Sequence, residues 1–103
     1  MQTDKQLVPD IAALLGVPFV AANWSGVDAV LPILEKMKVE GAVVVFKFDG
    51  ERGLEDNGAY TAIASGPPLG EDFLRVDAGT LEEALAYVIV RYAAKRWGYV
   101  RPS

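Results

Sequence analysis

The sequence has no cysteine and no histidine among its 103 residues. Without cysteine, the chain cannot form disulfides, thiolate metal ligands or a cysteine nucleophile. Without histidine, it lacks the imidazole that serine and cysteine triads, most zinc sites and most proton transfers at neutral pH require. We therefore assign no catalytic residue, metal ligand or cofactor, and expect a binding protein rather than an enzyme.

Motifs for nucleotides, membranes and secretion are also missing. Neither of the glycine-rich phosphate loops, GxxxxGK[ST] and GxGxxG, occurs, and no apolar run reaches the ~18 residues of a membrane span. The apolar stretch 11–22 has no positive segment before it and is interrupted by Gly16 and Pro18, unlike a secretory signal. Acidic residues outnumber basic ones by 14 to 10, so the net charge of −4 does not attract nucleic acid. We expect a cytoplasmic, acidic protein with neither nucleic-acid nor membrane partners.

The composition is that of an ordered globular chain. Hydrophobic residues make up 51% of the sequence and charged residues 23%, which excludes a disordered or fibrous protein. A chain of this length is too short for two domains and long enough to bury one core. We therefore expect a single domain over residues 1–103.

Two helices are predicted in the first half of the chain. The first spans residues 9–15, between a proline that suits the first helical position and a glycine that suits a left-handed stop. The second starts near Ser25 or Asp28 and ends before Gly41. A start at Asp28 leaves Pro32 in the first turn, where its ring does not clash with a preceding carbonyl. The buried stripe of this helix, at spacings of three and four, comprises Val27, Val30, Leu31, Leu34 and Met37.

Three strands follow, at residues 41–48, 59–65 and 72–76. The first is apolar on both faces, which predicts a central strand or one that is covered twice. The connections are short and rich in turn residues: Asp49-Gly50 or Asn57-Gly58 makes the first reversal, and residues 66–70 the second. Such connections favour antiparallel pairing.

The predicted fold class is therefore α+β, with a three-stranded antiparallel β-meander packed with helices. The order is helix, helix, three strands and a final helix. The extended segment 17–22 would make the sheet four-stranded if it pairs. Trp24, just before the second helix, is expected to pack on that helix rather than to anchor a partner.

The last helix is apolar on two sides. Thr80 and Glu83 form a capping box at its start, and Gly98 stops it. One face suits the sheet and comprises Leu81, Ala84, Leu85, Val88 and Tyr92. The opposite face must be covered either by the N-terminal helix and arm or by a second copy of the chain. In the predicted homodimer the contact residues are Ala86, Tyr87, Val90, Ala94 and Trp97.

Our leading prediction of function is a non-enzymatic protein-interaction domain that is homodimeric or binds another protein. One alternative is an acidic immunity or inhibitor protein, whose loop 49–58, with Glu71 and Asp72, binds a basic partner. A second alternative is a small-ligand binder or enzyme with an apolar pocket between the sheet and the helices. The residues predicted to line that pocket are Phe46, Phe48, Tyr60 and Tyr92.

Overall fold

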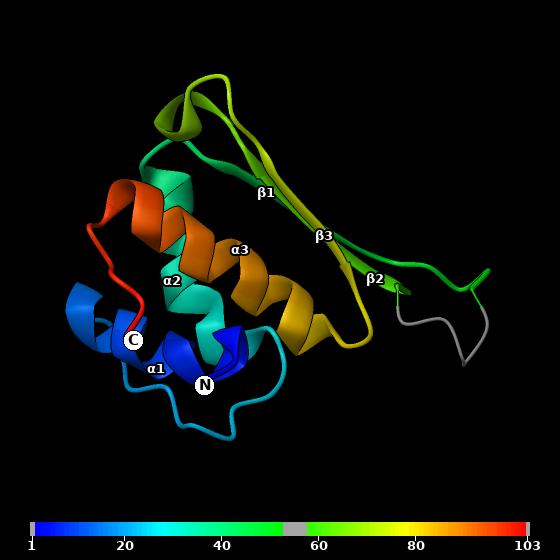
Figure 1. Ribbon diagram of the computed structural model, residues 1–103, viewed down its shortest axis with the longest axis horizontal. Coiled ribbons are helices and arrows are strands. Elements are labelled where there is room, and N and C mark those ends of the chain that lie inside the picture. The colour runs from blue at the N-terminus through cyan, green and yellow to red at the C-terminus, as the bar shows by residue number, and fades with distance from the viewer. Residues whose placement is uncertain (1, 53–57, 103) are drawn as a thin grey trace.

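The computed structural model describes residues 2–52 and 58–102, which form one layer of helices and one layer of strands. Figure 1 shows that the helices of these ranges all lie on one side of the sheet. The elements are α1 (Asp4–Leu15), a 3₁₀ turn η1 (Asp28–Val30), α2 (Leu31–Val39), β1 (Val43–Phe48), β2 (Tyr60–Ser65), a second 3₁₀ turn η2 (Pro67–Leu69), β3 (Leu74–Ala78) and α3 (Leu81–Arg96). The predicted α+β fold with a β-meander is confirmed.

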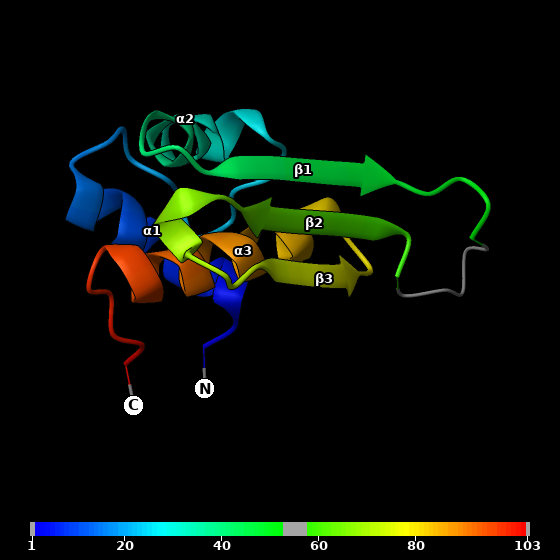
Figure 2. The ribbon, with the colours of Figure 1, turned by 90° about the horizontal axis from the view of Figure 1, so that it is seen from above.

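The strands of the described ranges form one antiparallel sheet in the order β1-β2-β3. Val43 pairs with Ser65, and Tyr60 pairs with Ala78. Figure 2 shows β2 in the middle and β1 at an edge. The prediction that residues 41–48 form a central or doubly covered strand is therefore wrong. Residues 17–22 contain no strand, although Val20 is buried, so the sheet has three strands within the described ranges.

Helix α1 begins at Asp4, earlier than predicted. The Thr3 side chain accepts a hydrogen bond from the Gln6 N–H, and the Gln6 side chain accepts one from the Thr3 N–H, which completes a capping box. Gly16 ends the helix in a left-handed conformation, as predicted. The sequence did contain the start signal, since threonine followed three residues later by glutamine is a capping-box pattern.

Pro9 consequently lies inside α1 rather than at its first position. A proline has no N–H, so the carbonyl of Lys5, four residues earlier, receives no helical hydrogen bond. The indole N–H of Trp24 donates to that carbonyl over 3.0 Å. Trp24 is therefore buried against α1, and it satisfies the backbone group that the proline leaves open.

Helix α2 follows the start predicted at Asp28, because η1 leads directly into it and Pro32 lies in its first turn. Val30, Leu34 and Met37 are buried as expected. Leu31, which was predicted to be buried, is instead 43% exposed. Ile33 is buried instead, and Val30, Ile33, Leu34 and Met37 together make the usual helical stripe at spacings of three and four.

The reversal between β2 and β3 lies at residues 66–70, as predicted, and contains η2. Gly66 has φ +110°, and a Cβ atom there would lie 2.8 Å from the carbonyl oxygen of Gly41. Only glycine fits this close approach. Strand β3 begins at Leu74, two residues beyond the predicted start. Strand β1 ends at Phe48 and β2 begins at Tyr60, and the predicted Asn57-Gly58 turn lies partly outside the described residues.

Helix α3 begins after Thr80, as predicted, with the Thr80 hydroxyl accepting a hydrogen bond from the Glu83 N–H at 3.1 Å. The Glu83 carboxylate accepts from the Thr80 hydroxyl and not from its N–H, so only half of the predicted capping box forms. Its sheet-facing side is buried except for the half-buried Leu81. Contacts with β2, β3 and α1 place α3 at the centre of one hydrophobic core. None of the described helices is both long and apolar enough to cross a membrane.

Candidate functional site

Helix α1 covers the second apolar face of α3, where the sequence allowed a dimer contact. The two helices pack together, and Ala86 and Val90 are buried. Tyr87 and Trp97 are half-buried, and Ala94 is exposed. Cover by the N-terminal helix, one of the two alternatives left open by the sequence, is therefore present in this fold. Ala86 and Val90 offer almost no surface to a partner.

The residues predicted to line a ligand pocket are divided among different surroundings. Phe48 and Tyr60 pack edge to face, with ring centroids 5.2 Å apart. Phe46 lines a groove against α2 to which Phe48, Tyr60 and Tyr92 do not contribute. Tyr92 is fully buried, and its hydroxyl donates to Glu40. The predicted set is therefore not brought together in that groove.

The acidic loop 49–58 lies partly outside the described residues, which exclude 53–57. In its described part, Asp49 pairs with Arg52 at 3.5 Å. Asp72 pairs with Lys95 on α3 at 3.1 Å, and Glu71 is exposed. Two of the carboxylates offered for a basic partner are thus already paired with cations of the same chain.

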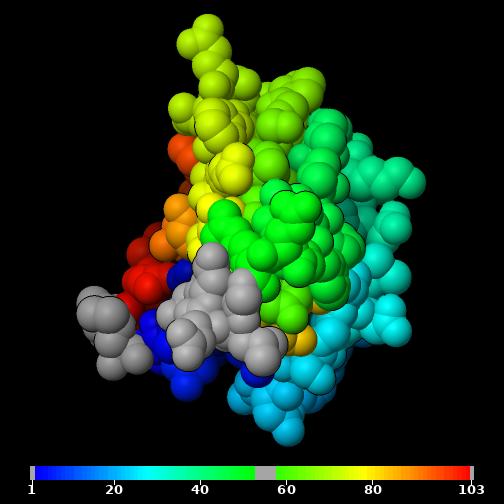
Figure 3. All heavy atoms as spheres, turned by 90° about the vertical axis from the view of Figure 1, so that its right-hand side faces the viewer, coloured from blue at the N-terminus to red at the C-terminus, as the bar shows by residue number. Residues whose placement is uncertain are grey.

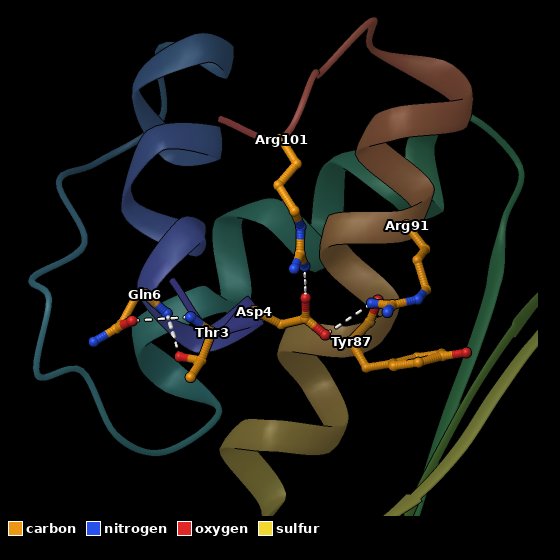
Figure 4. Close-up of polar contacts among 6 residues, drawn as sticks. All are labelled: Thr3, Asp4, Gln6, Tyr87, Arg91 and Arg101. Carbon is orange, nitrogen blue, oxygen red and sulfur yellow. Dashed lines mark hydrogen bonds and ion pairs between the residues drawn. The ribbon is translucent and has the colours of Figure 1, made fainter. Parts of the chain in front are cut away.

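A polar hollow of about 760 Å³ lies between the start of α1, strand β3 and helix α3. Asp4, on its rim, receives the guanidinium groups of Arg91, at 2.7 Å, and of Arg101 (Figure 4). The Arg91 guanidinium also stacks on the Tyr87 ring, 3.6 Å from its centroid. These contacts tie α1, α3 and the C-terminal segment together.

The other carboxylates of this hollow do not define a reaction. Asp77 accepts a hydrogen bond of 2.6 Å from the Thr61 hydroxyl, which keeps the pKa of that carboxyl below its usual value. Glu83 interacts with the Thr80 hydroxyl at 3.1 Å. Across residues 2–52 and 58–102, no group of three acidic side chains is arranged to hold a metal ion. We read the hollow as a place where three segments are joined by ion pairs.

The Asp4 ion pairs predict a modest effect on stability. Replacing Asp4 with asparagine should lower the free energy of unfolding by about 1 kcal/mol, because both arginines are partly exposed and such pairs contribute little individually. Urea unfolding at low and high salt measures this effect. The loss should shrink at high salt, and a loss that does not depend on salt would contradict the electrostatic explanation.

A second polar cluster joins the end of α2 to α3. The Glu40 carboxylate accepts hydrogen bonds of 2.7 Å from both the Tyr92 hydroxyl and the Trp97 indole. Burial opposes ionisation of Glu40, but these bonds, with Arg96 and Lys36 nearby, lower its pKa. Burial, the hydrogen bond to Glu40 and its negative charge raise the pKa of Tyr92 to about 12. Tyr92 is fully buried and Glu40 and Trp97 are half-buried, so the cluster ties α2 to α3 at the margin of the core.

The apolar surface left unexplained by the core lies on β1. Val43 is 55% exposed, Val45 50%, Phe46 39% and Phe48 62%. Among the described residues no strand pairs with β1 on the side away from β2. Figure 3 shows the end of this strand, in green, at the surface, with cyan residues of the α2 side beside it. An edge strand this apolar exposes an unusual amount of hydrophobic surface.

The backbone of β1 is arranged for further pairing. The N–H of Asp49 donates to Ala59, at the end next to β2. In an antiparallel strand the backbone groups of alternate residues point to opposite sides. The backbone N–H and C=O groups of Val43, Val45 and Lys47 therefore point to β2, like those of Asp49. The N–H and C=O groups of Val44, Phe46 and Phe48 therefore point to the open edge.

An apolar groove of about 260 Å³ accompanies this edge. It lies between α2 with its preceding turn and β1, and Glu35 and Lys38 bring one charge of each sign to it. In Figure 2, α2 lies beyond β1 on the side away from β2, so it overhangs the position of a further strand. The other lining residues are all apolar: Val27, Leu31, Leu34, Ala42, Val44 and Phe46.

We call β1 and this groove the open edge. The sequence signal for it was present in the doubly apolar run 43–46, which we interpreted as a sign of burial within the chain. Comparisons of this chain with models of protein families, with curated proteins and with solved structures find no match.

Proposed function

We propose that this chain is a non-enzymatic protein-interaction domain that binds its partner by adding a strand to the open edge. The observation that carries the proposal is the exposure of β1, an apolar strand whose outer backbone groups have no neighbouring strand among the described residues. Strand addition is a general mode of recognition in which backbone hydrogen bonds give affinity and side-chain pockets give specificity.

The groove supports this proposal because it provides the side-chain pocket. Alternate side chains of an added strand would point towards the helical layer, as those of β1 do. There they would meet the exposed part of Leu31 and the neighbouring lining residues of α2. Leu31, which departs from the predicted buried stripe, thus lies in the lining of this pocket.

This proposal keeps the protein-interaction function predicted from the sequence but places the surface on β1 instead of α3. The cytoplasmic location and the lack of nucleic-acid and membrane partners remain predictions. Of the alternatives, the acidic immunity or inhibitor protein has less support, because the carboxylates of Asp49 and Asp72 already pair with cations of the same chain. The small-ligand binder would use the polar hollow, but the Asp4 carboxylate there is already in an ion pair and the Asp77 carboxylate already accepts a hydrogen bond.

Substitutions at Val44 test the proposal, because its N–H points to the open edge. We expect V44A and V44P to keep the fold, since a proline is tolerated where the N–H faces away from the sheet. Peptides selected from a random phage-displayed library on the wild-type domain should bind V44A and lose at least about tenfold in affinity for V44P. NMR shifts on adding each peptide should map to β1 and α2.

The V44A variant is the matched control, since both substitutions remove the valine side chain and only proline removes the donor. Melting temperatures of the two variants show whether the fold is retained. Selected peptides that bind V44A and V44P equally, or whose NMR shifts lie elsewhere, would contradict the proposal. A library that yields no binding peptide would contradict it as well.

A further inference from the structure

We infer that the partner strand at the open edge is β1 of a second copy of this chain. The two strands would run antiparallel about a two-fold axis at Phe46 and join the two three-stranded sheets into one sheet of six strands. This inference rests on the proposed function, since it names the occupant of the same surface. It replaces the α3 face, which α1 covers, as the dimer contact.

The backbone selects one pairing register. Antiparallel strands exchange hydrogen bonds between residues whose backbone groups face each other, which here are Val44, Phe46 and Phe48. With the axis at Phe46, Val44 lies opposite Phe48 of the second copy, and Phe46 lies opposite its own counterpart. All the outward groups of β1 then find partners.

The two neighbouring registers are less favourable. An axis at Val45 would place Phe48 opposite Ala42 of the second copy, whose N–H already donates to the Met37 carbonyl at 3.0 Å. An axis at Lys47 would place that cation opposite itself, and like charges directly opposite one another destabilise a strand pair. With the axis at Phe46, Lys47 lies opposite the uncharged Val45.

The uneven cover of β1 fits a second copy in particular. Helix α2 and η1 lie beside the first half of β1, and the second half extends beyond the helices (Figure 2). Phe48, in that second half, is 62% exposed. Antiparallel pairing brings the α2 region of the second copy to this end of the strand. Each copy thus supplies the helical cover that the other lacks, and the exposed Leu31 becomes available to Phe48 of its partner.

A charge introduced at residue 45 tests this register. In the proposed dimer, residue 45 lies opposite Lys47 of the second copy, twice by symmetry. V45E should therefore create two favourable pairs and V45K two unfavourable ones. The dissociation constant of the V45K dimer should be at least about tenfold higher than that of the V45E dimer. Sedimentation equilibrium from micromolar to millimolar concentration measures both dissociation constants.

The net charge of the chain acts in the opposite direction and provides an internal control. From −4 in the wild type, V45E changes the net charge to −5 and V45K to −3, so general repulsion would weaken the V45E dimer instead. Val45 is half exposed, and both variants should melt within a few degrees of the wild type. A dimer of V45E that is stronger than that of V45K thus reports the local pair.

Cysteine cross-linking tests the axis independently, because the chain contains no cysteine. F46C should form a disulfide with its counterpart under mild oxidation, since facing residues of a hydrogen-bonded pair have Cα atoms about 5.5 Å apart. V45C should not, since its counterpart lies two residues along the partner strand and beyond the ~7 Å limit. Efficient cross-linking of V45C but not of F46C would overturn the register.

Failure of this inference can be told apart from failure of the proposed function. A wild-type chain that stays monomeric at millimolar concentration overturns the second copy as partner, as does a dimer that V45E and V45K weaken equally. If the selected peptides still require the Val44 N–H in that case, strand addition stands and its partner is another protein. If they do not, the proposed function fails too.

Discussion

Replacing Ala86 with glutamate is expected to unfold the protein or to lower its free energy of unfolding by about 4 kcal/mol or more. Ala86 is fully buried on α3, which packs against α1. A glutamate there must either bury an unpaired charge in the helical layer or push α1 away from α3. Circular dichroism and urea unfolding at neutral pH measure the effect.

Ala94 provides the matched control for this prediction. It has the same side chain and lies on the same helix, but it is exposed. A94E should change the free energy of unfolding by no more than about 0.5 kcal/mol. A folded A86E variant with an unchanged melting temperature would show that α1 does not cover α3. The α3 face would then again be available for a dimer.

Replacing Glu40 is expected to have the second largest effect. E40A removes the acceptor for the buried Tyr92 hydroxyl and for the Trp97 indole, and should cost about 3 kcal/mol at pH 7 because both donors lose a charged partner. E40Q keeps the shape and one acceptor oxygen, so it should cost less. Thermal or urea unfolding of the three proteins measures the ranking.

The pH dependence separates charge from shape. Glu40 has a lower pKa in the folded protein than its ordinary value of 4.5, so its contribution to stability is present above pH 4.5 and lost as the pH falls through the folded pKa. The difference between the wild type and E40Q should therefore be largest near neutral pH and shrink below pH 4.5. A difference that stays constant down to about pH 3 would contradict the role of the Glu40 charge.

The main helices and strands could be predicted because their signals are local. Thr80, Glu83 and Gly98 mark the ends of α3, and the glycine and proline residues of 66–70 mark a reversal. These signals depend on hydrogen bonds and backbone angles within a few residues. The start of α1 at Asp4 was missed because Pro9 was interpreted as a first helical residue, although Thr3 and Gln6 carried the stronger signal.

The candidate site could not be predicted because its properties depend on which segments meet. The apolar pattern of residues 43–46 does not distinguish a strand buried inside the sheet from an edge strand that faces a partner. The sequence likewise left open whether α1 or a second copy covers Ala86 and Val90. Only the three-dimensional arrangement places α1 on α3 and leaves β1 open.

The hydrogen bond between Trp24 and the Lys5 carbonyl has a consequence for how the chain acquires its structure. Since Pro9 removes one internal bond of α1, a peptide containing only this helix would leave that carbonyl to water. The donor comes from a segment 19 residues away. The helix and the following loop are therefore expected to gain order together, which makes the start of the chain a cooperative part of the domain.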